Sequence, residues 1–268
     1  MESMFKSLFR KKIQVPSHDE NWQVYFSSIN NQVTSVIVDI NVAEIAPINS
    51  LSEVFYLIIP FDYANEEGLP TIESYKLINE VEDKISDLIV RYGENMLHVS
   101  TLTMNSERLQ MYYCHKVENS KAFLSQLDKD FGEKLTYQID HRHDPNWSDY
   151  FNLAYPLPFQ MEMINNRIVL RQLTEAGDDL KESRNVHHYL AFREEKDMDE
   201  FLQFAESERF VLFLKEKRDE LWKLGISRQD YVSYEQIDEL CLPIWEKAKS
   251  FNGIYSGWES EVIRTKNQ

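Results

Sequence analysis

The order of apolar patterns along this chain constrains its fold more than any other feature. Between residues 54 and 140, alternating or wholly apolar runs predict strands, and apolar residues three or four apart predict helices. The expected elements are a strand at 54–61, a helix at 71–92, strands at 96–104 and 108–115, a helix at 119–131 and a strand at 134–140. The order is therefore β-α-β-β-α-β, with residues 105–107 as the hairpin turn.

The second half of the chain repeats this order behind one additional helix. The expected elements are a helix at 161–176, a strand at 184–193, a helix at 197–206, strands at 210–217 and 221–227, a helix at 233–252 that Pro243 should kink or split, and a strand at 255–263. The two repeats predict an α+β fold of two ferredoxin-like β-α-β-β-α-β sandwiches. Each should have a four-stranded antiparallel sheet covered by two helices.

A short internal echo, D-x-N-W-x-x-Y-F, occurs at residues 19–26 and again at residues 144–151. Each copy lies near the expected start of a half, so we predict that Trp22 and Trp147 are both mostly buried at comparable sheet edges. A platform for a carbohydrate or a base is the alternative. The proline-bearing segment 155–158 is the expected linker. The expected layout is a flexible basic segment at 1–15, an N-terminal domain at 16–150 and a C-terminal domain at 151–268.

The first 14 residues differ from the rest of the chain. Phe5, Leu8 and Phe9 are interspersed with basic side chains, which makes a short basic amphipathic stretch. We expect a loose chain end, because termini are usually poorly held. A helix that lies on a membrane surface or docks on a partner is the alternative.

Composition and charge exclude several classes of function. The seven glycines are scattered, so no phosphate-cradling loop can be built from them. Cys114 and Cys241 are isolated, which fits a reducing compartment such as the cytoplasm and excludes a thiolate metal cage. No apolar run approaches the roughly 20 residues that span a bilayer. The net charge of −16 argues against nucleic-acid binding and favours either a basic partner or solubility alone.

Histidines supply one candidate for metal chemistry. His141 and His143 share a face near a strand end and could bind a metal together with His115. No second paired motif completes a ligand shell, so a charged strand end is the favoured interpretation. The sequence predicts no metal and no cofactor.

A carboxylate and histidine site is the candidate for catalysis. His188 shares its strand face with apolar residues and is expected in the core, whereas His187 lies on the more polar face and could act as a general base. Asp178 and Asp179 follow Gly177, although turns at helix ends use such residues routinely. Because no nucleophile motif accompanies them, we predict that the protein is not an enzyme.

The closing segment, residues 253–259, contains two glycines, and we expect each position to require glycine for a different reason. Gly253 should follow the last helical turn in a left-handed conformation. Gly257 should leave room for a neighbouring backbone or ring. Strand alternation places Tyr255, Gly257 and Glu259 on one face and Trp258 on the other.

Several motifs of the second half resemble the regulator of ribonuclease E activity B family. They are Asn166-Arg167-Ile168-Val169, Gly177-Asp178-Asp179-Leu180, Arg184-x-Val186-x-His188, Tyr189-x-x-Phe192 and Gly253-x-Tyr255-x-Gly257-Trp258-Glu259. The resemblance covers about residues 160–263. It implies a bacterial protein of ferredoxin-like fold that binds the endoribonuclease and inhibits it without cleaving anything itself. The first half is similar to the bacterial domain of unknown function 695, which brings no activity with it.

The motif residues define the candidate functional surface, which comprises Asp178, Asp179, Arg184, His187, His188, Tyr255, Trp258 and Glu259. The predicted function is that of a cytoplasmic, non-enzymatic regulator that binds a protein with a basic surface, such as an endoribonuclease. No direct contact with nucleic acid or membrane is expected. Two alternatives stay open: an enzyme with the carboxylate and histidine site, and a small-ligand sensor with a pocket between its domains.

Overall fold

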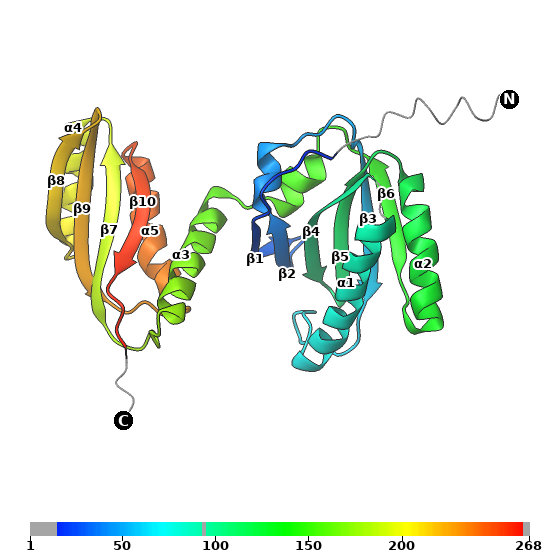
Figure 1. Ribbon diagram of the computed structural model, residues 1–268. Helices are drawn as coiled ribbons and strands as arrows, with labels where there is room; N and C mark the ends of the chain where they lie inside the picture. The colour runs from blue at the N-terminus through cyan, green and yellow to red at the C-terminus, as the bar shows by residue number, and fades with distance from the viewer. Residues whose placement is uncertain (1–14, 93–94, 265–268) are drawn as a thin grey trace. The chain divides into compact units, whose positions relative to one another are not determined.

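The computed structural model describes residues 15–92 and 95–264 (Figure 1). The chain divides into two compact units, unit 1 (Met1–Pro156) and unit 2 (Leu157–Gln268), and each is described by itself. The expected loose basic segment lies outside the described residues, apart from its last residue, Val15. None of the described helices is long and apolar enough to cross a membrane.

Unit 1 contains one six-stranded antiparallel sheet. Its elements are β1 (Trp22–Ile29), β2 (Gln32–Asp39), η1 (Ile40–Glu44), β3 (Glu53–Pro60), α1 (Ile72–Tyr92), β4 (Met96–Met104), β5 (Glu107–Cys114), η2 (Val117–Ser120), α2 (Lys121–Phe131), η3 (Gly132–Lys134), β6 (Gln138–His143) and η4 (Tyr150–Ala154). The strand order is β1-β2-β4-β5-β3-β6. The predicted β-α-β-β-α-β unit is present as β3 to β6, and its strand order is that of a ferredoxin-like sandwich.

The prediction of four strands in this half is wrong, because a hairpin of β1 and β2 extends the sheet. β2 pairs with β4 from Ser35↔Thr103 to Val38↔Ser100 and so occupies an edge that β4 would otherwise present to solvent. Val36 and Val38 of β2 have no exposed surface. Their burial anchors the added hairpin in the core.

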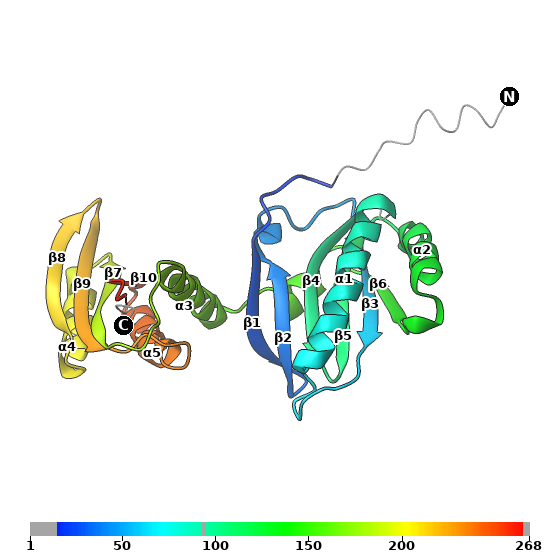
Figure 2. The ribbon, with the colours of Figure 1, turned by 60° about the horizontal axis from the view of Figure 1, so that its bottom comes forward.

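Both helices of unit 1 cover the same face of the sheet (Figures 1 and 2). The buried residues of α1 recur every three or four positions, which gives the helix one apolar side. The core that they form with the sheet and α2 comprises Phe55, Leu57, Ile59, Val81, Ile85, Leu88, Met96, Tyr112, Cys114, Phe123 and Leu127.

The opposite face of the unit 1 sheet is covered by residues 144–156. Trp147 is fully buried and stacks on Tyr113 of β5, with 3.9 Å between the ring centroids. Its indole Nε1 donates to the carbonyl of Leu51 at 2.9 Å. Tyr113 and Tyr56 donate their hydroxyls to the carboxylates of Asp144 and Asp149, each at 2.6 Å. This segment therefore works as a plug that seals one side of the sheet.

The two copies of the D-x-N-W-x-x-Y-F motif therefore do not mark equivalent sheet edges. Both copies belong to unit 1, and the second lies at its end rather than at the start of unit 2. Trp147 is buried as predicted, but Trp22 is only half-buried, on the helix-covered face of β1. The expectation of equivalent positions is wrong, because one tryptophan lies in the plug and the other in an edge strand.

Unit 2 is a smaller sandwich whose strands are arranged like β3 to β6 of unit 1. Its elements are α3 (Pro158–Glu175), β7 (Arg184–Phe192), α4 (Glu195–Ser207), β8 (Val211–Arg218), β9 (Leu221–Asp230), α5 (Ile237–Ser250) and β10 (Ile254–Ser260). The antiparallel sheet has the order β10-β7-β9-β8, so this half has the four strands that were predicted. Pro243 does not split α5, which continues from Ile237 to Ser250.

The core of unit 2 lies between the sheet and its helices. It includes Val186, Leu190 and Phe192 of β7 together with the buried faces of α4 and α5. Figure 1 shows α4 and α5 on one side of this sheet. The other side, which we call the open face, has no described element of unit 2 over it.

Candidate functional site

The eight residues of the candidate surface fall into a buried set and a surface set. Asp178, Arg184, His188, Tyr255 and Trp258 are buried, whereas Asp179, His187 and Glu259 have exposed area. The buried set holds unit 2 together, and only the surface set can meet a partner directly.

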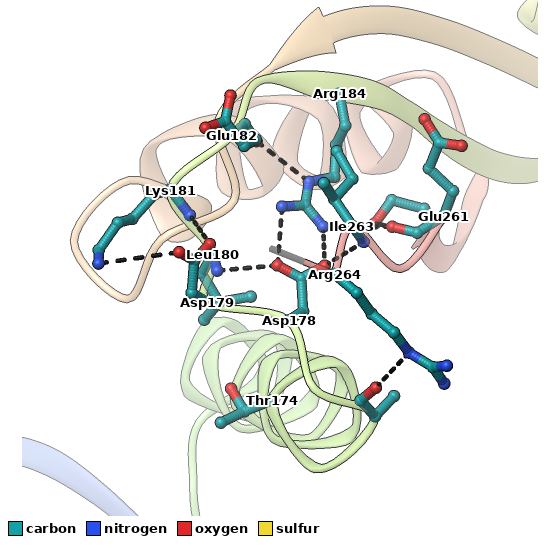
Figure 3. Close-up of polar contacts among 12 residues, drawn as sticks. Thr174, Asp178, Asp179, Leu180, Lys181, Glu182, Arg184, Glu261, Ile263 and Arg264 are labelled. Atoms are coloured by element: carbon teal, nitrogen blue, oxygen red, sulfur yellow. Dashed lines mark hydrogen bonds and ion pairs between the residues drawn. The ribbon is translucent and has the colours of Figure 1, made fainter. Parts of the chain in front are cut away.

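Asp178 and Arg184 form a buried ion pair at the turn between α3 and β7 (Figure 3). Neither side chain has exposed surface, and the guanidinium contacts both carboxylate oxygens. Asp178 also accepts hydrogen bonds from the backbone amides of Leu180 at 2.8 Å and Ile263 at 2.7 Å. The pair therefore ties the start of β7 to the segment that follows β10.

The pKa of Asp178 is lowered despite its burial. Desolvation alone would raise it, but the hydrogen bonds from Arg184 and the two backbone amides outweigh that effect. Asp178 is thus a fixed carboxylate whose acceptor sites are filled, and it has no free proton to give.

His188 is a core histidine, as its strand face predicted. Its Nδ1 lies 2.8 Å from the hydroxyl oxygen of Tyr255, and its ring packs edge-on against Phe210. Burial lowers the pKa of His188 to about 3, with smaller contributions from Arg228 and His187. Its Nε2 is buried without a hydrogen-bond partner. The ring is therefore neutral at pH 7.

Trp258 fixes β10 to α3 and α5 through a chain of polar contacts. Its Nε1 donates to Asn166 Oδ1 at 2.9 Å, and Asn166 Nδ2 donates to Asp238 Oδ1 at 2.9 Å. The guanidinium of Arg167 completes the chain at 2.6 Å from Asp238 Oδ2. The resemblance motif at residues 166–169 is thus explained in part by its packing on the closing strand.

The closing strand differs from the predicted alternation because it contains a bulge. The register with β7 shifts between Tyr255 and Gly257, so Tyr255 and Trp258 both reach the core while Glu259 stays on the open face. Gly257 has a φ of +104° and open space around it, so its backbone conformation requires glycine. Gly253, by contrast, has no positive φ, and the Phe192 ring occupies the place of its missing side chain. The predicted reasons for the two glycines are therefore reversed: Gly257 is needed for its backbone conformation, and Gly253 for the space that the Phe192 ring fills.

The open face carries a cluster of aromatic and polar side chains from three strands. Phe213 of β8 lies edge-on to His187 and Tyr189 of β7, with centroid distances of 4.8 and 5.7 Å. Tyr189 donates its hydroxyl to Glu259 Oε1 of β10 at 2.6 Å. Phe213 remains 42% exposed, and Val211 on the same edge strand is 65% exposed. We call Val211, Phe213, His187, Tyr189 and Glu259 the aromatic cluster.

Gly225 of β9 makes this cluster possible. A side chain at this position would meet the Phe213 ring at 2.6 Å, so the absence of one lets the ring lie across the sheet. The register shift between Leu212 and Leu214 on β8 accompanies this placement. Sequence reasoning missed Phe213 as a surface residue, although a glycine in the middle of an expected strand was an available signal.

The alternative catalytic site does not form. Asp178 is occupied by Arg184, while His187 lies on the open face against Phe213. Asp179 interacts with Lys181 and with the backbone of the same turn.

The histidines considered for a metal site lie in unit 1, where His115 contacts the Ser50 carbonyl and His143 contacts Glu53. Within residues 15–92 and 95–264, no group of three or more His, Cys, Asp and Glu side chains is placed to hold a metal.

Comparison with known proteins finds a family match within each unit. Residues 20–155, half of the chain, match the family of unknown function DUF695, and the chain belongs to that family. Residues 163–260 match the family described as regulator of ribonuclease activity B. The expected resemblances of both halves are confirmed, and neither family description is that of an enzyme.

Other comparisons add little. No curated protein matches this chain. Among solved structures, a proposed glycine cleavage system transcriptional repressor is 10% identical, with 78% of this chain and 98% of that chain covered and a TM-score of 0.23. An unknown protein from Galdieria sulphuraria is 9% identical, with coverage of 79% and 99% and a TM-score of 0.21. Neither likeness supports an argument about fold or function.

Proposed function

We propose that this protein binds a ribonuclease through unit 2 and regulates its activity, without catalysing a reaction itself. The open face, centred on the aromatic cluster, is the proposed docking surface. The observation that carries the proposal is an exposed aromatic group on a sheet face that no described element of unit 2 covers, in the segment that matches the ribonuclease regulator family.

The chemistry of the cluster suits protein recognition. Aromatic side chains dominate the binding energy of many interfaces because they bury a large area at a small entropic cost. The contacts of Phe213 with His187 and Tyr189 hold the rings in place before a partner arrives. Glu259 adds an anionic group next to this apolar centre. An apolar centre with charged neighbours is the usual layout of an interface.

The charge of the chain supports a basic partner. A ribonuclease must present positive charge to hold an RNA backbone, and a protein with a net charge of −16 is attracted to such a surface and repelled by RNA itself. The attraction would accelerate association and weaken as salt rises. Cys114 and Cys241 are unpaired and buried, in keeping with the reducing cytoplasm that we propose as its location.

An inhibition assay tests this function. Purified full-length protein is titrated into a ribonuclease of the E type from the same organism, with a fluorescent RNA as substrate. Phe213→Ser should weaken inhibition about tenfold or more, since a central aromatic anchor is lost. Tyr234→Ser removes a comparably exposed aromatic that packs on Arg167 of α3, on the helix side of the unit, and should leave inhibition unchanged.

Two results would count against the proposal. Absence of both complex formation and inhibition at low salt would refute ribonuclease regulation altogether. Equal weakening by the Phe213 and Tyr234 variants would keep the regulator function but remove the open face as the docking surface.

A further inference from the structure

Unit 1 has a hollow of about 510 Å³ beside α1, on the helix-covered face of its sheet. The β1–β2 hairpin widens the sheet here, and Val24 and Phe26 on the same face of β1 are more than half exposed. The volume lies in the range of small-molecule sites, roughly 300–1,000 Å³. The residues that matter for its chemistry are Trp22, Ile37, Glu82, His98, Arg108 and Tyr112.

One wall of the hollow is a run of three rings. The ring of His98 lies 5.0 Å from that of Trp22 and 4.8 Å from that of Tyr112. Burial lowers the pKa of His98 to about 4, so this ring is uncharged at pH 7. Trp22 and His98 are both half-buried and have accessible surface, whereas Tyr112 is buried. Such a wall allows a planar molecule to stack.

Another part of the lining is an ion pair between the buried Arg108 and the half-buried Glu82, which has unused hydrogen-bonding capacity. Arg108 donates from Nε to Glu82 Oε1 at 2.6 Å, from Nη2 to Oε2 at 2.8 Å and from Nη1 to Thr103 Oγ1 at 2.7 Å. Gln110 donates to Glu82 Oε1 at 3.2 Å. A guanidinium carries five N–H donors, and a carboxylate oxygen can accept two bonds. The described contacts therefore leave Arg108 with donors, and Glu82 Oε2 with an acceptor position, for a ligand.

We propose that this hollow binds a planar, uncharged heterocycle with a lactam edge, in which a carbonyl lies next to an N–H. The carbonyl accepts a hydrogen bond from Arg108, the adjacent N–H donates to Glu82, and the ring stacks on Trp22. Glu82 already neutralises Arg108 and Glu20 adds a negative charge at the lining, so the site disfavours anions such as free phosphate. This inference concerns unit 1 and does not depend on the proposed function of unit 2.

Hypoxanthine and 1-methylhypoxanthine test the inference as a matched pair of probes. Each is titrated into the full-length protein while the indole N–H signals are followed by nuclear magnetic resonance. Hypoxanthine should shift the Trp22 signal. The methylated probe should bind at least about tenfold more weakly, because its lactam N–H is replaced and the Glu82 acceptor is left unpaired. The probe pair tests the polar edge without replacing a buried charge of the protein.

Two variants test the stacking wall. Trp22→Leu should weaken hypoxanthine binding roughly tenfold, the effect of losing one aromatic stacking partner. Phe26→Leu makes the same kind of change four residues further along the same face of β1 and should leave the affinity within about twofold, since Phe26 is not part of the lining. Amide signals of the sheet report on folding of both variants, and binding to the Trp22 variant is followed through those of His98 and Thr101. The inference is overturned if hypoxanthine produces no shift at its solubility limit, if both probes bind equally, or if Trp22→Leu has no effect.

Discussion

The β3–β6 part of the unit 1 sheet and the unit 2 sheet share a strand order, but the two sheets differ in what lies on the face opposite the helices. In unit 1, residues 144–156 seal that face, with Trp147 stacked on Tyr113 and two tyrosine–carboxylate hydrogen bonds beside it. In unit 2, the same face carries the aromatic cluster and no described element of that unit covers it. The same arrangement of strands thus produces a closed scaffold in one unit and an exposed aromatic surface in the other.

This difference explains why the buried and exposed residues of unit 2 should be considered separately. A sheet with one bare face obtains its stability from the helix side and from its ends. The Asp178–Arg184 pair and the Trp258–Asn166 contact lie at those places. They support the strands that present His187, Tyr189 and Phe213. Residues of the resemblance motifs therefore include scaffold residues as well as surface residues.

The largest expected effects on stability come from substitutions in the buried contacts that hold each unit together. Asp178→Asn leaves the buried charge of Arg184 without its partner and should lower the free energy of unfolding of unit 2 by about 3–5 kcal/mol. Asp179→Asn at the neighbouring, partly exposed position should change it by no more than about 0.5 kcal/mol. Urea unfolding, followed through the indole N–H signal of Trp258 in nuclear magnetic resonance spectra, provides the measurement. Similar losses for both variants would contradict a supporting role specific to Asp178.

Unit 1 should depend on its plug to a comparable degree. Trp147→Ala removes a fully buried indole and its bond to Leu51, and should cost about 3–5 kcal/mol. Trp22→Ala should cost less, about 2 kcal/mol, because that ring is only half-buried. Urea unfolding of unit 1 compares the two. Equal losses of unfolding free energy would mean that the two copies of the D-x-N-W-x-x-Y-F motif have equivalent roles. This result would contradict the distinction between the plug and the edge strand.

A smaller effect is expected from the buried histidine of unit 2. The folded-state pKa of His188 is about 3, below the ordinary value near 6.5, so the unfolded state binds more protons between these values. Stability is therefore complete above about pH 6.5 and falls as the pH drops towards 3, by about 2 kcal/mol between pH 7 and pH 5. Urea unfolding of unit 2 at several pH values across this range measures how steeply its free energy of unfolding depends on pH. His188→Asn should make this dependence weaker, and an unchanged dependence would exclude His188 as its source.

Most of the fold could be predicted because each helix and strand is encoded by a local pattern. The buried positions of α1 and the alternation of β7 are visible in the sequence, and both β-α-β-β-α-β units follow from their order. The pairing of β2 with β4 could not be predicted in the same way, because it joins residues that are far apart in the chain, such as Ser35 and Thr103. Local pattern does not specify which edge an additional hairpin will occupy.

The candidate site was harder to predict than the fold, for a related reason. Asp178 lies six residues before Arg184, but their burial also depends on the segment around Ile263, which joins them from the far end of unit 2. The roles of Gly253 and Gly257 were exchanged because a bulge and a ring contact depend on the neighbouring strand. Phe213 escaped notice because an apolar residue in a strand is expected in the core.

Hydroxyl-radical footprinting of the complex tests the central claim most directly, because it reports the solvent exposure of individual side chains. Full-length protein is oxidised alone and with a ribonuclease of the E type, and the modified residues are identified by mass spectrometry. We predict strong protection of Phe213 and Tyr189 on the open face, with Tyr234 on the helix side oxidised equally in both samples. Protection of Tyr234 while Phe213 stays fully reactive would contradict docking through the open face.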